Sequence, residues 1–300
     1  MGERTVPRIL EASLLVDARA ALGEAPLWDA REDALAWVDI LAGVVFVTSA
    51  SGELRASFEV GHAVGSAMPA EEGGWLLADA MGFSRLAPDG RTTRLLDVLA
   101  DRPDLRFNDA KCDPMGRAWA GTIESAMSPG TGTLYRLDPG PVATPVLEAL
   151  TVSNGLGWSP DARTMWFADS ADRFLRGFDY EPERGHLGAR RLAIELQDTA
   201  GKADGLCVDD AGCVWVGLWG GGAVHRYTPE GRLDTIVRVP AGQVTSCAFG
   251  GPDGSTLYIT SARVGLTPET LKREPHAGGL FVVAPGVTGP AATPWRREPS

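Results

Sequence analysis

A short segment that recurs six times along this chain limits its possible folds more than any other feature. Each copy has a short apolar stretch, then a turn rich in Asp, Pro and Gly, then a strand-like run that carries an aromatic residue. The copies read LWDAREDALAWVD (27–39), AMPAEEGGWLLAD (67–79), KCDPMGRAWAG (111–121), GWSPDARTMWFAD (157–169), CVDDAGCVWVG (207–217) and AFGGPDGSTLYIT (248–260).

One equivalent residue in each copy sets the period of the repeat. These reference residues are separated by 40, 44, 46, 50 and 41 positions, a period typical of β-propellers and related repeat arrays. They are Trp28, Met68, Cys112, Trp158, Val208 and Phe249.

The intervals between copies supply a second pair of strands. Runs with a turn between strand-like stretches occur at 45–60, 83–98, 133–150, 223–239 and 279–286. Two hairpins per repeat make a four-stranded blade, so we predict an all-β fold: a six-bladed β-propeller with four-stranded blades around a central channel. We expect one domain over residues 1–300, with a strand around 9–16 completing the last blade. The possible helical turns, near 95–100 and 267–273, are interpreted as parts of loops.

Composition narrows the choice of partners and compartment. The chain has 28 basic and 39 acidic residues and a net charge of −11, which disfavours nucleic acid and anionic membranes as partners. The sequence shows neither a signal peptide nor an apolar run of about 18 residues, so we expect a cytoplasmic protein. The four cysteines lack paired metal-ligand spacing and are expected to be free, buried thiols.

Four positions before the reference residues stand three side chains with oxygen atoms suited to a metal: Glu24, Asn154 and Asp204. Residues just before the innermost strand of each blade converge on the channel of a propeller, and converging oxygen ligands suit a hard divalent cation. We therefore predict one metal site formed by these three residues. Read singly, Asn154-Gly155 and Asp204-Gly205 are also typical hairpin turns, and Glu24 could be a solvated loop carboxylate.

Asn108 occupies the same position in a fourth repeat, two residues after Arg106. On an extended strand these two side chains project to one face, where both could bind a polyhydroxylated ligand. The alternative is that Arg106 pairs with an Asp on a blade surface. Asp109 is interpreted as a turn residue, or as a group that contacts the metal ligands without being a ligand itself.

Two further groups of residues have competing interpretations. Asp39, Asp79 and Asp169 share an offset of eleven after the reference residue and are expected to cap loops, although they could orient the ligands. His62 and His276 lie in predicted loops where a general base could stand, but a plain loop histidine is the commoner case. Trp219, in a glycine-rich stretch, could form a wall of the site.

Motifs of other hydrolases and of nucleotide-binding proteins are missing from the sequence, including Gly-x-Ser-x-Gly, His-Glu-x-x-His and the phosphate-binding glycine loops. Several long segments, in order along the chain, instead resemble the SMP-30/gluconolactonase/LRE family, of which regucalcin is the best-known animal member. These segments are LGEAPLW (22–28), RFNDAKCDPMGRAWAGT (106–122), SNGLGWSPD (153–161), ADGLCVDDAGCVWV (203–216) and HAGGLF (276–281).

The resemblance implies a six-bladed propeller with one divalent metal ion that hydrolyses sugar lactones. Glu24, Asn154 and Asp204 match the family's metal ligands, and Arg106 and Asn108 match its substrate-binding pair. Glu124 lies near a substrate-contacting glutamate found in some members, although its register is shifted. Asp204 is expected to act also as general base toward the attacking water. The metal could be calcium, zinc, magnesium, manganese or ferrous iron, because an all-oxygen site with open positions accepts each of them.

The expected ligand is a small sugar lactone of the aldonolactone type, and the sequence does not indicate the oligomeric state. Two alternatives stay open. One is a hydrolase of phosphotriesters or of non-sugar lactones, which an apolar channel mouth would favour. The other is a calcium-binding regulatory propeller without catalysis.

Overall fold

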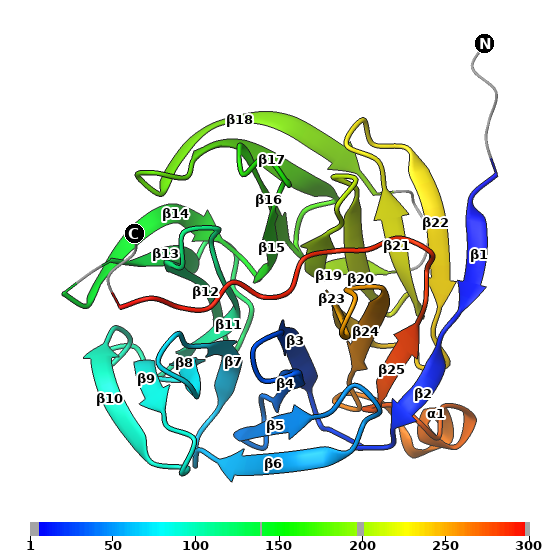
Figure 1. Cartoon of the computed structure of the whole chain (residues 1–300), viewed down its shortest axis with the longest axis horizontal. Helices are drawn as coiled ribbons and strands as arrows, with labels where there is room; N and C mark the ends of the chain where they lie inside the picture. Colours follow the sequence, from blue (N-terminus) through cyan, green and yellow to red (C-terminus); the bar gives the residue numbers. More distant parts are fainter. Residues whose placement is uncertain (1–5, 139, 197–200, 298–300) are drawn as a thin grey trace.

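Short strands separated by tight turns make up nearly the whole described chain. The computed structural model describes residues 6–138, 140–196 and 201–297, and its strands form six sheets arranged as blades around a centre (Figure 1). The first three blades are β3 (Gly23–Asp29), β4 (Ala34–Asp39), β5 (Val44–Thr48) and β6 (Leu54–Glu59); β7 (Val64–Pro69), β8 (Trp75–Asp79), β9 (Gly82–Leu86) and β10 (Thr92–Asp97); and β11 (Leu105–Cys112), β12 (Ala118–Glu124), β13 (Gly132–Asp138) and β14 (Val142–Leu150).

The remaining blades follow the same plan, with strands from the N-terminal segment added at two edges. The fourth is β15 (Ser153–Trp158), β16 (Thr164–Asp169), β17 (Phe174–Glu181) and β18 (His186–Glu195). The fifth is β19 (Lys202–Val208), β20 (Val214–Trp219), β21 (Ala223–Tyr227) and β22 (Leu233–Arg238), with β1 (Arg8–Glu11) as an extra strand. The sixth is β23 (Val244–Gly250), β24 (Thr256–Ser261), β25 (Leu280–Val283) and β2 (Ser13–Val16).

The predicted all-β class and six-bladed propeller are confirmed. Each innermost strand packs against the next, and β23 packs against β3, so the ring closes. The N-terminal stretch around 9–16 divides between two blades. Its second part, β2, pairs antiparallel with β25 of the sixth blade, while its first part, β1, pairs in parallel with β22 of the fifth.

Four details differ from the sequence-based expectation. Residues 268–273 form a short helix, α1 (Pro268–Arg273), in which the Thr267 hydroxyl accepts a hydrogen bond from the Thr270 N–H. The stretch 95–100 is not helical, since its first residues complete β10. The second hairpin of the fourth blade, β17 and β18, was not predicted because its outer strand carries many exposed polar residues. In the sixth blade, residues 279–286 were expected to form a hairpin but supply only one strand, β25, whose partner β2 comes from the N-terminal segment.

In the third and fifth blades, the repeated turn and its tryptophan form the same local structure. In the third blade, the Asp113 carboxylate accepts hydrogen bonds from the backbone N–H groups of Met115 and Arg117 and from the Trp119 indole. In the fifth blade, Asp209 accepts the indole N–H of Trp215 in the same way. A buried aspartate therefore closes the turn and fixes the tryptophan, whose ring fills the space between blades.

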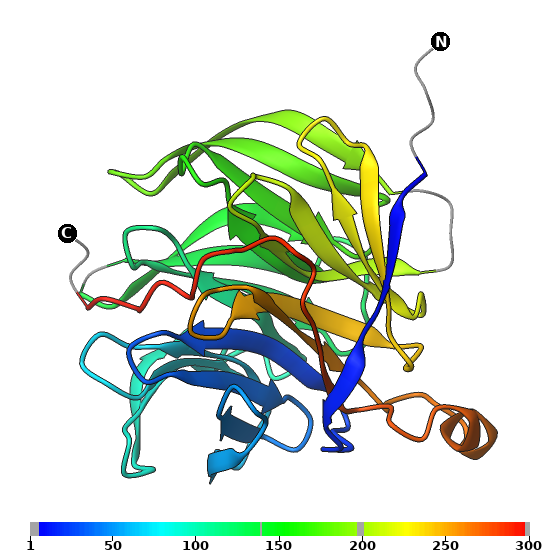
Figure 2. The same cartoon turned by 45° about the vertical axis from the view of Figure 1, so that its right-hand side comes forward.

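Segments after the last blade cross one face of the ring (Figures 1 and 2). Residues 285–296 form this strap, which hydrogen-bonds through its backbone to Trp28, Pro69, Gly116, Asp210 and Gly254 on five of the six blades. The strap ends with the buried Trp295. It covers the face where the innermost strands end, which leaves the face where they begin as the open mouth of the channel.

The four cysteines are free and buried, as predicted. Five tryptophans are almost completely buried in the core: Trp28, Trp37, Trp119, Trp166 and Trp215. In the described part of the chain, no helix has the length and apolar character needed to cross a membrane.

Candidate active site

A cavity of about 960 Å³ lies at the face of the ring where the innermost strands begin. Its walls come from the first residues of β3, β11, β15 and β19 and from the loops of neighbouring blades. All six residues singled out in the sequence line this one cavity: Glu24, Arg106, Asn108, Glu124, Asn154 and Asp204. Trp219, considered as a wall of the site, lines it too, whereas His62 and His276 do not.

The repeated position lies inside the innermost strand, at a break in its pairing, and not before the strand as expected. In all six blades the register between the innermost strand and its neighbour shifts at this position. Such β-bulges re-aim side chains and are common beside active sites. Glu24, Asn154 and Asp204 lie at these bulges, and all three line the cavity.

Asn154-Gly155 and Asp204-Gly205 are therefore strand residues and not hairpin turns. The glycines are needed because the neighbouring innermost strand approaches closely. A Cβ on Gly155 would lie 2.4 Å from the Leu206 nitrogen, and one on Gly205 would lie 2.0 Å from the Ser246 hydroxyl oxygen. Close packing of the innermost strands around the narrow axis thus explains both dipeptides.

The amide side chains of Asn108 and Asn154 meet across two blades. Asn108 Nδ2 donates to Asn154 Oδ1 at 2.8 Å and to the Ser153 carbonyl at 2.9 Å. Arg106 Nη1 donates to Asn108 Oδ1 at 2.6 Å and to the Phe107 carbonyl at 3.1 Å. The guanidinium thus pairs with an amide and a carbonyl through Nη1, and Arg106 also lines the cavity.

Glu24, Asp204 and Asp109 form a buried acidic group in the channel, each at most 5% exposed. Burial, followed by repulsion from Asp109, raises the pKa of Glu24 to about 8. Burial, then repulsion from Glu24 and Asp109, raises the pKa of Asp204 well above its usual range. The protein alone therefore disfavours two ionised carboxylates here, and a cation between them would offset that cost.

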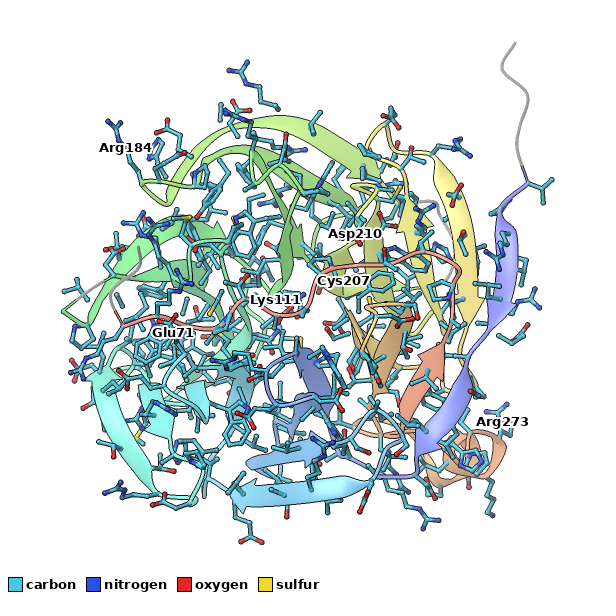
Figure 3. The ribbon with its side chains drawn as sticks, viewed as in Figure 1. Glu71, Lys111, Arg184, Cys207, Asp210 and Arg273 are labelled. Atoms are coloured by element: carbon cyan, nitrogen blue, oxygen red, sulfur yellow. The ribbon has the colours of Figure 1, made fainter. Side chains whose placement is uncertain are left out.

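Asp109 belongs to this group although the sequence analysis assigned it to a turn or to the region behind the ligands. It lies in the bulge of β11, and neither of its carboxylate oxygens has a hydrogen bond of ordinary geometry among the described residues. Burial raises its pKa, and the Lys111 ammonium opposes that rise. Figure 3 places Lys111 near the centre of the ring, where its ammonium donates to the Leu206 carbonyl.

Burial lowers the pKa of Arg106 to about 10, and the negative charges of Glu24 and Asp204 oppose that shift. At neutral pH its guanidinium stays charged and faces a cavity that also contains acidic groups. The Arg106 guanidinium can therefore donate hydrogen bonds to the oxygen atoms of a neutral ligand in the cavity.

Glu124, at the end of β12, has a second role in the loop that follows. Its Oε2 accepts a hydrogen bond from the Ser128 N–H at 3.0 Å, and its carbonyl accepts one from Met127. Met127, in the left-handed region at φ 54°, is thereby held at the edge of the cavity. Glu124 borders the cavity but is partly engaged by its own loop.

The three aspartates at the shared later offset cap loops, as expected. Asp39 accepts hydrogen bonds from the N–H groups of Ala21 and Leu22, and Asp169 accepts those of Thr151 and Val152. Asp79 binds Met81, Gly82 and the Arg94 guanidinium. In the first and fourth blades, these contacts hold the backbone that leads into Glu24 and Asn154.

The donor set fits a hard divalent cation. Glu24 and Asp204 supply carboxylates, and Asn154 supplies a neutral amide oxygen, which together match the oxygen preference of calcium, magnesium or manganese. Within residues 6–138, 140–196 and 201–297, no cluster of three or more His, Cys, Asp or Glu side chains is placed to hold a metal ion. The candidate site differs from such a cluster because its third ligand, Asn154, is an amide.

Sequence reasoning missed Ser170, whose hydroxyl accepts a hydrogen bond from Asn154 Nδ2 at 2.7 Å. It follows the capping residue Asp169, a position with no repeat offset to mark it. It also missed the apolar rim, formed by Leu41, Met127 and Val264, which line the cavity from loops of three different blades and are 51%, 58% and 37% exposed.

The fold and the site define the class of protein: a closed six-bladed propeller in which acidic and amide side chains line one mouth of the channel. Comparison with known proteins gives the family. The family model described as SMP-30/Gluconolactonase/LRE-like region matches residues 22–263, and the chain belongs to this family.

Individual relatives agree with this membership. Regucalcin of Danio rerio is 34% identical over 284 residues, covering 93% of this chain and 96% of that protein. A Bacillus subtilis (strain 168) protein provisionally named sugar lactone lactonase YvrE is 32% identical over 274 residues, covering 91% and 94%. The structure of a calcium-binding protein, regucalcin, from Agrobacterium tumefaciens superposes with a TM-score of 0.92 at 26% identity, covering 97% of this chain and all of that one. These family relationships support a sugar lactonase.

Proposed function

We propose that this protein is a divalent-metal-dependent lactonase that opens a sugar lactone of the gluconolactone type to the aldonic acid. The observation that carries the proposal is the convergence on one cavity of Glu24, Asn154 and Asp204 with the donors Arg106 and Asn108. A relative named as a lactonase and the family match support the reaction type.

Glu24, Asn154 and Asp204 would hold the cation. When bound, a divalent cation supplies Lewis-acid polarisation of a carbonyl oxygen and lowers the pKa of water. The chain's own residues bind the lactone and move the proton. The Arg106 guanidinium donates to ring hydroxyls and fixes the lactone in the cavity, and the second lone pair of Asn108 Oδ1 accepts from another hydroxyl.

Asp204 is the proposed base. A water attacks the lactone carbonyl carbon, and Asp204 accepts one of its protons as the new C–O bond forms. The bond between that carbon and the ring oxygen then breaks, and the proton passes to the ring oxygen, which leaves as a hydroxyl of the aldonic acid.

The test is proton release near neutral pH on a panel of aldonolactones: glucono-, galactono-, xylono- and arabinonolactone. Chelator-stripped protein is compared with protein reloaded separately with calcium, zinc, magnesium, manganese or ferrous iron. Activity should vanish on stripping and return with at least one metal. Hydrolysis no faster than the spontaneous rate, in folded and metal-occupied protein, would contradict the proposal, and turn attention to a calcium-binding role like that in the names of the relatives.

The apolar rim of Leu41, Met127 and Val264 favours a second candidate, a hydrolase of non-sugar lactones or phosphotriesters. Apolar side chains at a channel mouth contribute binding energy to an alkyl or aryl substituent and none to a hydroxyl. Adding a γ-alkyl lactone and an aryl phosphotriester to the panel separates the candidates. A higher kcat/KM on these esters than on every aldonolactone would favour the second.

A further inference from the structure

A one-way chain of hydrogen bonds runs through the candidate site across three blades. Arg106 donates to Asn108 Oδ1 at 2.6 Å, and Asn108 Nδ2 donates to Asn154 Oδ1 at 2.8 Å. Asn154 Nδ2 donates to Ser170 Oγ at 2.7 Å, and Ser170 Oγ donates to the Ala203 carbonyl at 2.5 Å. The chain thus begins at a guanidinium and ends at a backbone carbonyl next to Asp204.

The groups at the two ends of this hydrogen-bond chain determine which atom donates and which accepts in every bond between them. A guanidinium has only donors, and a carbonyl oxygen has only lone pairs. Ser170 has a single hydroxyl proton and gives it to the Ala203 carbonyl, so toward Asn154 its oxygen can only accept. Asn154 must therefore turn its NH₂ group to Ser170, which leaves its Oδ1 on the side of Asn108 and the channel.

The orientation of the Asn154 amide decides whether this residue can bind a cation. An amide oxygen is a metal ligand, whereas an NH₂ group pointing at the same place would repel a cation and present no lone pair. Rotating the side chain by half a turn exchanges the two with little change in shape. A neighbouring group that can only accept a hydrogen bond must face the NH₂ group of Asn154, so it selects one of these two orientations.

The hydroxyl that performs this selection is itself held in place. The Ser170 N–H donates to the Val152 carbonyl at 3.0 Å, and the preceding Asp169 carboxylate accepts from Thr151, Val152 and Ala171. Ser170 lies just after β16, while Asn154 lies in β15 of the same blade, so one blade carries both the amide and its orienting group.

We propose that Ser170 is a positioning residue that makes Asn154 present its oxygen to a divalent cation in the channel. This inference rests on the metal site of the proposed function. Groups that orient metal ligands from behind typically contribute about 10–100-fold to metal affinity. Ser170 should therefore act on the affinity for the cation, without binding the cation or the lactone.

The experiment measures the Kd of Ca²⁺ and of Mn²⁺ by calorimetric titration of metal-stripped protein. Ser170→Ala should weaken binding about 10–100-fold, whereas Ser170→Thr, which keeps the hydroxyl in a half-buried place beside the cavity, should stay within about threefold of the wild type. Ser125→Ala is the matched control, because the Ser125 hydroxyl lines the same cavity and donates to the Asp104 carbonyl, but touches none of the three candidate ligands. Its Kd should not change.

A double-mutant cycle with Asn154→Asp separates orientation from general damage. A carboxylate presents an oxygen whichever way it turns, so in the Asn154→Asp background Ser170→Ala should weaken the Kd by less than about threefold. Urea unfolding of each stripped variant reports whether it is folded.

The outcomes are distinct. Equal Kd values for the wild type and Ser170→Ala would overturn the inference. An equal loss of cation affinity from Ser170→Ala in the wild type and in the Asn154→Asp background would also overturn it, and so would a Ser170→Thr variant that binds as weakly as Ser170→Ala. If the folded wild type binds neither cation, the metal site of the proposed function fails and this inference falls with it. Weak binding confined to Ser170→Ala in the Asn154 background supports it.

Discussion

Asn108 Nδ2 lies 2.8 Å from Asn154 Oδ1, and this hydrogen bond joins two residues 46 positions apart that occupy the same place in consecutive blades. The same Asn108 side chain accepts from Arg106, so it connects the proposed substrate-binding residue to a proposed metal ligand. Under the proposed function, equivalent repeat positions would therefore have different tasks in this site: Asn108 would bind the substrate and Asn154 the cation.

Replacing Asn108 should weaken substrate binding. Asn108→Ala removes the acceptor that steadies the Arg106 guanidinium and one contact to the lactone, and each such hydrogen bond contributes about 1–3 kcal/mol. We expect KM to rise about tenfold or more on the best lactone of the panel, with a smaller fall in kcat. Steady-state kinetics measures both, and an unchanged KM would exclude Asn108 from substrate binding.

Replacing Asp204 should stop turnover. In Asp204→Asn the side chain keeps its shape and one oxygen but cannot accept a proton, so kcat should fall by about 10²–10⁴. Metal content measured by elemental analysis accompanies the kinetics. Asp101→Asn, on an exposed loop, is the control. Near-normal turnover of Asp204→Asn with intact metal content would show that another group takes the proton.

The glycine after Asn154 should be far less replaceable than the glycine two positions later. A Cβ on Gly155 would collide with the backbone of β19 at 2.4 and 2.7 Å, whereas one on Gly157 would meet only the side-chain methyl groups of Leu206 and Val208, at 3.2 Å. We expect Gly155→Ala to cost about 1–3 kcal/mol or more of unfolding free energy and Gly157→Ala clearly less. Urea unfolding compares the two, and equal costs would mean that β15 and β19 pack less closely than described.

Acid should destabilise the fifth blade through His225. This side chain is 6% exposed, its Nδ1 lies 3.2 Å from the Tyr227 hydroxyl, and burial lowers its pKa to about 4. Because the pKa in the folded state is below the value of about 6.5 in the unfolded state, the unfolded chain binds the proton first as the pH falls. The stabilisation linked to the neutral His225 side chain is complete above about pH 6.5 and is lost as the pH falls from there to about pH 4. The loss in unfolding free energy is at most about 3 kcal/mol.

The measurement is the free energy of unfolding at pH 7 and pH 5 for the wild type and His225→Gln. The variant has no titrating group at this position, so its stability should fall less over that interval. Identical pH dependence of the two proteins would mean that His225 does not titrate with a lowered pKa.

The sequence by itself determined the six-fold repeat, the all-β class and the equivalence of Glu24, Asn108, Asn154 and Asp204. It could do so because every blade must supply an apolar stretch, a turn closed by polar groups and an aromatic at fixed intervals. Residues at one offset from that pattern occupy one place in each blade. Closure of the ring then brings them to the same mouth of the channel, whatever their distance along the chain.

Only the tertiary structure decided what depends on contacts between blades. The bulges at the site residues, the buried carboxylate of Asp109 and the apolar rim arise where neighbouring strands and loops approach each other. The split of the N-terminal segment between the fifth and sixth blades depends on which sheet edges are open. The orientation of the Asn154 amide depends on Ser170, which follows a strand of the same blade and has no equivalent in the repeat. Periodicity encodes position within a blade, but it carries no information about hydrogen-bond direction or about the distance to the next blade, because those are set when the ring closes.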